Sequence, residues 1–147
     1  MPHYFEDFAA GQIFRSPPLT VEAAAIVAFA KEFDPQPFHL DDNEARNSLF
    51  DGLAASGWHT AALTMRLCVA SDFQPAGGII GVGGELSWTV PVRPNDTLRV
   101  ECEVLETRLS RSRPSQGIVK VRITTLNQRV EIVQTFTPTL FVDRRPA

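Results

Sequence analysis

The sequence predicts an α+β domain in which one antiparallel β-sheet wraps around a central buried helix. Residues 57–71 lack proline, are rich in alanine and leucine, and carry a single full charge, Arg66. Such a segment is expected to form a helix of about four turns that is apolar around most of its circumference. After residue 79 the chain alternates apolar and polar residues, which is typical of strands that bury one face. A curved sheet built from those strands is the surface that can cover the helix.

Length and composition favour one domain over residues 1–147. With 147 residues, 44% of them hydrophobic, the chain is ordinary for a single globular core. The net charge of -3, with both signs interspersed, provides no basic stripe, so nucleic acid is not expected as a partner. The central helix is too short to cross a bilayer, which takes about 20 apolar residues. The first residues carry no secretion signal, so we expect a cytoplasmic protein without a membrane partner.

The two cysteines are expected to be buried, reduced thiols. Cys68 falls in the apolar helix and Cys102 in an apolar strand pattern, and neither has the spacing of a metal ligand. The prediction therefore includes no metal and no cofactor.

Before the central helix, the chain is expected to form one short strand and one amphipathic helix. Residues 12–16 favour a strand, which two consecutive prolines end because proline donates no ladder hydrogen bond. Thr20 is the expected N-cap of a helix whose apolar residues recur every three or four positions. That helix should end by Asp34, because Pro35 disfavours the α conformation in the residue before it.

The second half is expected to form a meander of four long strands. Alternation places apolar residues on one face in the segments 82–92, 98–104, 118–126 and 130–142. A turn at residues 94–96 should join the first two of these strands. In a meander each strand pairs with its neighbours in sequence, so the first strand is expected beside the second.

Residues 34–42 are the segment where chemistry is expected. Pro35 and Pro37 fix φ and remove two backbone donors, so the segment is predicted to be a stiff extended loop. Such a loop can hold Asp34 and His39 at a fixed separation, where a carboxylate and an imidazole together polarise a water molecule. The alternative is structural: Asp34 caps a turn, and His39 is a partly buried ring bonded to the backbone.

A second candidate feature is the N-terminus of the central helix. A short helix over residues 43–47, capped by Asp41 or Asp42, leads to it, and Ser56 is the expected N-cap. The free N–H groups and partial positive charge of a helix N-terminus suit an oxyanion that develops on a carbonyl. Gly57 would let that group approach closely; the alternative is that Gly57 only permits tight packing of the incoming loop.

Three ordered segments resemble one known family. They are Asp34-Pro35-Gln36-Pro37-Phe38-His39-Leu40-Asp41, Ala54-Ala55-Ser56-Gly57-Trp58-His59-Thr60, and Gly84-Glu85-Leu86-Ser87-Trp88-Thr89-Val90-Pro91-Val92 followed by Asp96. The first resembles the signature Asp-x-Asn-Pro-x-His-x-Asp of the MaoC-like, or R-specific enoyl-CoA hydratase, group of the hotdog fold. The resemblance extends over nearly the whole chain and implies a single hotdog domain.

The resemblance implies roles for individual residues. Asp34 and His39 would hold the water of hydration, and the backbone N–H of Gly57 would help bind the oxygen of a thioester. The resemblance also implies a CoA- or acyl-carrier-linked substrate and a homodimer whose two sheets join edge to edge. One departure is Gln36, which stands where the family usually has asparagine. Another is Met65, which a count from Gly57 puts where the family often has a serine or threonine that supports the aspartate.

Further residues are candidates for substrate binding: Gln36, Phe38, Ser56, Trp58, His59, Arg111 and Arg113. His59 follows Gly57 closely enough to line an acyl pocket, and the alternative is a core histidine bonded to a carbonyl. The two arginines lie on a serine-containing loop, where a guanidinium can form bidentate contacts with CoA phosphates. The alternative for both arginines is a solvated surface position.

The predicted function is a hydro-lyase that adds water reversibly to a 2-enoyl thioester and gives a 3-hydroxyacyl thioester. Asp34 would be the base toward water, and His39 would orient that water and donate or return a proton. The Gly57 N–H would stabilise the enolate-like charge. One alternative is a thioesterase that turns the same water onto the thioester carbonyl. Another is a non-catalytic hotdog module that binds an acyl group or completes an oligomer.

Overall fold

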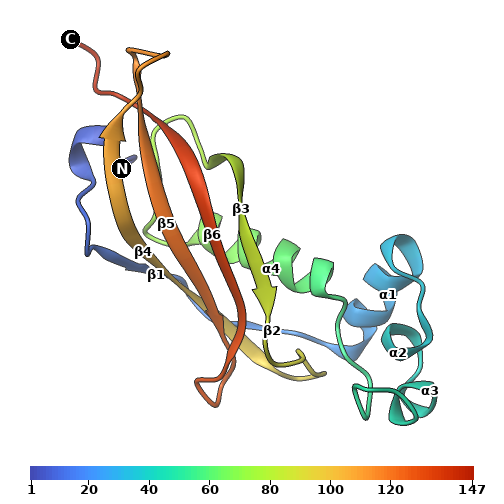
Figure 1. Cartoon of the computed structure of the whole chain (residues 1–147). Helices are drawn as coiled ribbons and strands as arrows, with labels where there is room; N and C mark the ends of the chain where they lie inside the picture. The colour runs from blue at the N-terminus through green and yellow to red at the C-terminus, as the bar shows by residue number, and fades with distance from the viewer.

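The computed structural model describes all residues 1–147 and contains one antiparallel sheet. Its long strands are β3 (Ile80–Trp88), β4 (Thr97–Leu109), β5 (Gln116–Leu126) and β6 (Ile132–Asp143). The short strands β1 (Ile13–Arg15) and β2 (Leu19–Thr20) both pair with β4, and the order across the sheet is β1-β4-β5-β6-β3. The sheet is twisted and curved, and helix α4 (Gly57–Ala70) lies along one side of it (Figure 1). This is the α+β architecture that the sequence predicts.

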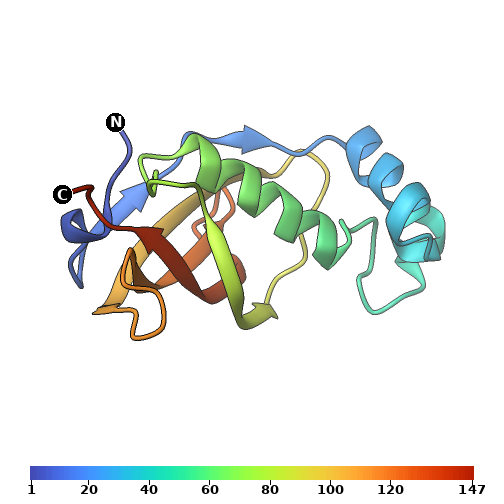
Figure 2. The same cartoon turned by 90° about the horizontal axis from the view of Figure 1, so that it is seen from above.

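Helix α4 begins where the sequence predicts, and one of its faces packs on the sheet (Figure 2). Ser56 is its N-cap, because the Ser56 Oγ accepts a hydrogen bond from the Trp58 N–H at 3.2 Å. The sheet of one chain covers only one side of the helix. On the other side Trp58, Met65 and Val69 are 61%, 38% and 62% exposed, so an apolar stripe of α4 faces outward.

The alternation predicted for the strands is confirmed where the sheet faces the helix. In β4 and β5 every second side chain of the predicted set is buried: Leu98, Val100, Cys102, Val104, Val119, Val121 and Ile123. They form one core with the buried face of α4 and with Phe73, which follows the helix. Removing this apolar surface from water is the main term that stabilises such a domain.

The predicted meander is correct for β4, β5 and β6 and wrong for β3. β3 pairs with β6, with Trp88 opposite Gln134, and has no pairing with β4. Residues 89–96 are therefore a crossing connection rather than a hairpin turn. Val92 in this connection is buried, and its carbonyl accepts a hydrogen bond from the Ala55 N–H at 2.9 Å. Alternation reveals a strand and its buried face, but it carries no information about which strand lies alongside.

Between residues 12 and 34 the predicted short strand and amphipathic helix are both present, but the helix starts later than predicted. A one-turn 3-10 helix, η1 (Phe5–Asp7), precedes β1. Helix α1 (Ala23–Phe33) ends with Asp34 as its C-cap, as the following proline requires. Its N-cap is Glu22 rather than Thr20, because Thr20 pairs with Thr97 between β2 and β4. Strand pairing thus overrides the local preference of threonine for an N-cap.

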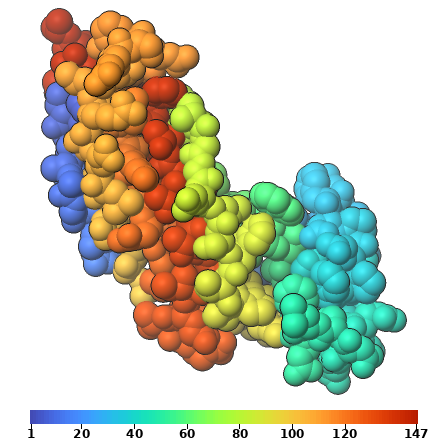
Figure 3. Space-filling view, in the orientation of Figure 1, coloured from blue at the N-terminus to red at the C-terminus, as the bar shows by residue number.

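The segment that the sequence predicts as a stiff extended loop contains a turn of helix instead. Residues Pro37–Leu40 form α2, with Pro37 at its first position, where the missing N–H would be unpaired in any case. The capped short helix that follows is confirmed as α3 (Asp42–Arg46), because Asp41 accepts hydrogen bonds from two N–H groups of its first turn. Helices α1, α2 and α3 form a lobe that projects from the end of the domain where α4 begins (Figure 3).

The cysteines are free and buried, as predicted. The Sγ atoms of Cys68 on α4 and Cys102 on β4 lie 3.8 Å apart. The hydrogen bond with Cys68 and burial raise the pKa of Cys102 far above its ordinary value, which keeps this thiol protonated. No helix has the length and apolarity needed to span a membrane.

Candidate active site

Asp34 lies at the end of α1 and is held by two side-chain donors. Its side chain is 16% exposed. Ser56 Oγ donates to Asp34 Oδ2 at 2.7 Å, and Gln36 Nε2 donates to Asp34 Oδ1 at 2.5 Å. Burial alone would raise the pKa of Asp34, but the hydrogen bonds from Ser56 and Gln36 and the nearby His39 outweigh it and lower that pKa. The carboxylate is therefore ionised at neutral pH.

The support of this carboxylate comes from a residue that the family resemblance does not indicate. The resemblance points farther along the helix, to Met65, which lies on the outward face of α4 and is 38% exposed. Ser56 at the N-cap takes that place: its hydroxyl donates to Asp34 and accepts from the Trp58 N–H. The extra methylene of Gln36 does not break its amide contact, because the side chain still reaches Asp34.

His39 lies on α2 and is buried, with its ring orientation set by the backbone. Nδ1 is 2.7 Å from the carbonyl oxygen of Ala54. A carbonyl only accepts hydrogen bonds, so in the neutral ring Nδ1 carries the proton and Nε2 carries the lone pair. The rings of Phe38 and Phe50 pack against the imidazole with centroids at 4.6 Å and 5.6 Å. The backbone bond expected under the structural alternative is present, but it leaves Nε2 free.

The structure brings together the two side chains that the sequence predicts as a pair. His39 Nε2 lies 3.4 Å from Asp34 Oδ2. With a neutral imidazole both atoms are acceptors, so they cannot bond each other directly. A water molecule that donates one hydrogen to each atom satisfies both, and its oxygen lone pairs then point away from the pair. This geometry is suited to presenting a polarised water to a ligand.

The first turn of α4 borders the same space. The N–H of Gly57 has no hydrogen-bond acceptor within the chain. A Cβ added to Gly57 would lie 2.6 Å from the ring of Trp88, so glycine is required here for packing. The neighbour that requires it is a strand residue rather than the incoming loop. Gly57 thus has a packing role, although not against the incoming loop that the alternative names, and its N–H stays available to a ligand.

A cavity of about 540 Å³ opens beside these groups. Asp34, Gln36, His39 and Gly57 contribute to its wall together with apolar side chains from β3, β6 and the connection after β3. An apolar cavity with a few convergent polar groups is the usual form of a small-molecule site. No group of three or more His, Cys, Asp or Glu side chains is arranged to hold a metal ion.

Three of the predicted substrate-binding residues line this cavity, and the others do not. Gln36, Phe38 and Trp58 line it, and Ser56 supports Asp34 from behind. The buried ring of His59 instead stacks on Phe29 with a centroid separation of 4.6 Å. Burial lowers the pKa of His59, and its Nδ1 has no hydrogen-bond partner, so the expected bond to a carbonyl is not formed.

The two predicted phosphate-binding arginines lie far from the cavity of their own chain. Arg111 and Arg113 are on the loop between β4 and β5, at the opposite end of the sheet from α2 (Figure 1). The guanidinium of Arg113 lies over the ring of Phe141 at 5.0 Å. The structure therefore does not bring either arginine to Asp34 and His39 within one chain.

Sequence reasoning misses Phe50 and Trp88, which both line the cavity. Phe50 lies in a loop without a recognisable motif, and its contact with His39 depends on how that loop folds back. Trp88 follows the strand alternation, which predicts a core residue. No local signal distinguishes a core aromatic from one that borders a cavity, so neither residue is identifiable from its neighbours in sequence.

The fold and the site define a hotdog domain that carries a carboxylate and imidazole pair beside the N-terminus of its central helix. The chain belongs to the MaoC-like domain family, whose model matches residues 7–127. A relative in Bacillus subtilis, the uncharacterized protein YdeM, is 34% identical over 125 residues, which cover 84% of this chain and 87% of that protein. The (R)-specific enoyl-CoA hydratase of Rhodospirillum rubrum is 32% identical over 102 residues, 65% of each chain. The crystal structure of the MaoC-like dehydratase from Rhodospirillum rubrum matches with a TM-score of 0.96 at 59% identity, over 99% of both chains.

Proposed function

We propose that the protein is a hydro-lyase that adds water reversibly to a 2-enoyl thioester and forms a 3-hydroxyacyl thioester. One observation carries the proposal: Asp34 Oδ2 and His39 Nε2 lie 3.4 Å apart, on a cavity wall that also holds the unpaired Gly57 N–H. Hydration of a conjugated thioester needs a polarised water and a donor to the thioester oxygen, and this wall offers both. The name of the hydratase relative supports the same reaction.

The chemistry follows from the protonation states of the pair. Asp34 accepts one proton from the water while the water oxygen bonds to C3 of the enoyl group. The second hydrogen of this water is donated to His39 Nε2. This hydrogen bond turns a lone pair of the water oxygen toward C3. Negative charge moves to the thioester oxygen, where the Gly57 N–H at the positive end of α4 stabilises it. A proton delivered to C2 from Asp34 completes the addition and regenerates the carboxylate.

The cavity supports a thioester of CoA or of an acyl carrier as substrate. Its apolar wall includes Trp88, Val90 and Val133, which suit an acyl chain, while Gln36 and His39 both lie within 3.4 Å of the Asp34 carboxylate. Arg111 and Arg113 can contact CoA phosphates at this cavity only if they come from a second copy of the chain. Their predicted role thus rests on an oligomer.

We also propose that the protein forms a homodimer. The apolar stripe of α4 and the exposed residues Ile80 and Val82 of β3 lie on elements that run side by side (Figure 2). β3 is an edge strand, whose unpaired backbone groups can pair with a second copy. The expectation of two sheets joined edge to edge agrees with this exposure.

A crotonyl-CoA assay with two simultaneous readouts tests the function. Hydration removes the absorbance of the conjugated enoyl thioester and releases no thiol, and this is the expected result. Release of free thiol would instead identify a thioesterase. If neither signal changes across several chain lengths, including an acyl-carrier substrate, the protein is a non-catalytic module and the proposed reaction is wrong.

A further inference from the structure

In the loop of residues 50–53 the N–H groups of Asp51, Gly52 and Leu53 are bonded, but three carbonyl oxygens have no partner in a helix or strand. Asp51 and Gly52 adopt positive φ values of 51° and 137°. In this conformation the carbonyl oxygens of Phe50, Gly52 and Leu53 do not join a regular ladder, and an unpaired carbonyl away from water is costly. The loop leads directly into Ala54, whose carbonyl accepts the Nδ1–H of His39.

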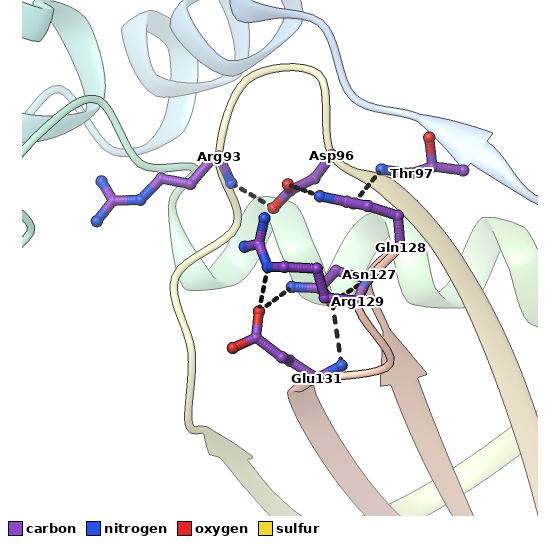
Figure 4. Close-up of polar contacts among 7 residues, drawn as sticks. All are labelled: Arg93, Asp96, Thr97, Asn127, Gln128, Arg129 and Glu131. Carbon is purple, nitrogen blue, oxygen red and sulfur yellow. Dashed lines mark hydrogen bonds and ion pairs between the residues drawn. The ribbon is translucent and has the colours of Figure 1, made fainter.

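One side chain binds all of these carbonyls. Arg93 Nη1 donates to the Gly52 oxygen at 2.8 Å and reaches the Leu53 oxygen at 3.4 Å, while Nη2 donates to the Phe50 oxygen. Figure 4 shows the Arg93 side chain extending away from the other labelled residues of its turn. A planar guanidinium has several donors in a fixed arrangement, which suits carbonyls that converge on one point.

Arg93 is itself anchored at its backbone. Its N–H donates to Oδ2 of Asp96 at 2.8 Å, and Asp96 is 3% exposed. Oδ1 of Asp96 accepts from Gln128 Nε2 at 2.8 Å, and Gln128 Oε1 accepts from the Thr97 N–H at 2.9 Å (Figure 4). The hairpin between β5 and β6 thus fixes the turn that carries Arg93. The guanidinium is therefore presented from a rigid base.

The opposite side of the 50–53 loop faces His39. The ring of Phe50 packs on the imidazole at 5.6 Å and on Phe38 at 5.0 Å. The Ala54 oxygen, directly after the loop, lies 2.7 Å from His39 Nδ1 and sets which nitrogen carries the proton. Whatever fixes the loop therefore fixes both the ring position of His39 and its tautomer.

We propose that Arg93 is a positioning residue for the reaction: it holds the 50–53 loop so that His39 keeps its proton on Nδ1 and presents Nε2 to the water. This inference rests on the proposed hydration. Arg93 acts through Phe50 and Ala54 and need not touch the substrate. Without its guanidinium the three carbonyls lose their shared donor, the loop relaxes, and His39 is free to place its proton on either nitrogen.

The test uses Arg93→Gln, which keeps a polar side chain but cannot donate to all of the carbonyls. We expect kcat for enoyl thioester hydration to fall by about 10- to 100-fold with little change in KM, since small displacements of catalytic groups cost about that much. Arg129→Gln is the matched control. Arg129 lies in the same group of residues in Figure 4 but pairs with Glu131 at 2.8 Å and does not contact the loop. Its kcat should stay within about twofold of the parent value.

A spectroscopic readout separates positioning from a purely structural role. The chain has 3 histidines, so the imidazole ¹⁵N signals can be assigned individually. His39 should show a protonated Nδ1 and a bare Nε2 in the parent and in Arg129→Gln, and a mixture of tautomers in Arg93→Gln. If Arg93→Gln loses kcat while His39 keeps its single tautomer, the inference is wrong. It is also wrong if kcat stays within about twofold of the parent.

Arg93→Lys is a second variant that keeps the test decisive if Arg93→Gln does not fold. The ammonium keeps the charge and some donors but not the planar arrangement, so both the loss of kcat and the tautomer mixing should be intermediate. An Arg93→Lys variant with near-parent kcat, or with lower kcat but a single His39 tautomer, would also contradict the inference. If the parent hydrates no enoyl thioester, the proposed function fails, and the tautomer comparison still decides whether Arg93 controls His39.

Discussion

Asp34 is the residue whose charge state most directly affects the site. Two side-chain donors and the neighbouring imidazole hold its pKa below the ordinary value. The carboxylate is therefore ionised throughout the range from about pH 5 to pH 8, given an ordinary Asp pKa of about 3.9. In the proposed reaction this carboxylate accepts a proton from water and then donates it to C2 of the enoyl group.

The first prediction concerns Asp34→Asn. The amide matches the carboxylate in size but cannot accept a proton from water, so kcat for hydration should fall by about 10²- to 10⁴-fold. Asp41→Asn is the control, because Asp41 only accepts backbone N–H groups at the start of α3 and asparagine caps a helix equally well. Near-normal kcat in Asp34→Asn would remove Asp34 from the proposed role of base.

The same variant should change how stability depends on pH. A lowered folded-state pKa means that the unfolded state binds the proton more tightly, so stability is present above the unfolded pKa and is lost as the pH falls through the folded pKa. Thermal denaturation between about pH 6 and pH 3 should therefore show a shallower acid loss in Asp34→Asn than in the parent. An unchanged acid slope would mean that the hydrogen bonds to Asp34 do not stabilise its ionised form.

A second prediction concerns Ser56→Ala. Loss of the Ser56 hydroxyl removes a donor to Asp34, so the Asp34 pKa rises and the acid limb of kcat/KM should move to higher pH. Loss of the N-cap should also destabilise the protein by about 1 kcal/mol. Ser71→Ala is a matched control at the other end of α4, where Ser71 bonds the Cys68 carbonyl. It should lower stability without moving the acid limb.

Among the elements, α4 and β3 depend on each other at one contact. The Trp88 ring lies where a Cβ of residue 57 would be, and the ring is held by a hydrogen bond from Trp88 Nε1 to Gln134 Oε1 at 2.9 Å. The ring therefore cannot move aside without breaking that bond. The start of α4 is positioned by β3 as well as by its own N-cap.

A third prediction follows for Gly57→Ala. The added methyl should destabilise the protein by about 1–3 kcal/mol through overpacking, even though alanine favours a helix. In a Trp88→Phe background the smaller ring leaves room, so Gly57→Ala should cost less there, which a double-mutant cycle in urea measures. Additive losses would show that Trp88 is not the neighbour that demands glycine.

At the scale of the whole molecule, exposed apolar residues of α4 adjoin the edge strand β3, because the half-exposed rings of Trp58 and Trp88 have centroids 5.3 Å apart. A monomer rarely leaves a large apolar patch next to an unpaired strand edge, because both favour association. The fourth prediction is a dimer at micromolar concentration by light scattering. Val69→Arg should shift it toward monomer, whereas Leu109→Arg, at a residue that is 54% exposed at the far end of β4, should not. A parent that is monomeric at all concentrations would contradict the proposed dimer.

Much of the fold is predictable because its signals are local. Ser56 and Gly57 mark the start of α4 through hydrogen bonds within one turn, and Pro35 ends α1 through a clash with its own neighbour. Alternation in β4 and β5 identifies the buried face because side chains of a strand point to opposite sides in turn. Residue types and short spacing identify Asp34 and His39 as candidates, and the resemblance to the MaoC-like family is what favours a pair over the structural alternative.

Other features depend on contacts between segments distant in the chain. Thr20 has the side chain of a good N-cap, yet pairing with β4 places it in a strand. β3 lies beside β6, at the edge of the sheet, although the same alternation would also fit a place beside β4. The order of strands therefore needs the tertiary structure.

For this chain, short-range physics is enough to predict the helix and the buried strand faces, and the family resemblance is what favours Asp34 and His39 as a pair. The tertiary structure adds the parts that turn the pair into a site: Ser56 on Asp34, the Ala54 carbonyl on His39, and Arg93 on the 50–53 loop. Each of these contacts joins residues more than ten positions apart. The energy of each contact depends on the distance between its partners in the folded protein. Local preferences of the chain do not determine that distance.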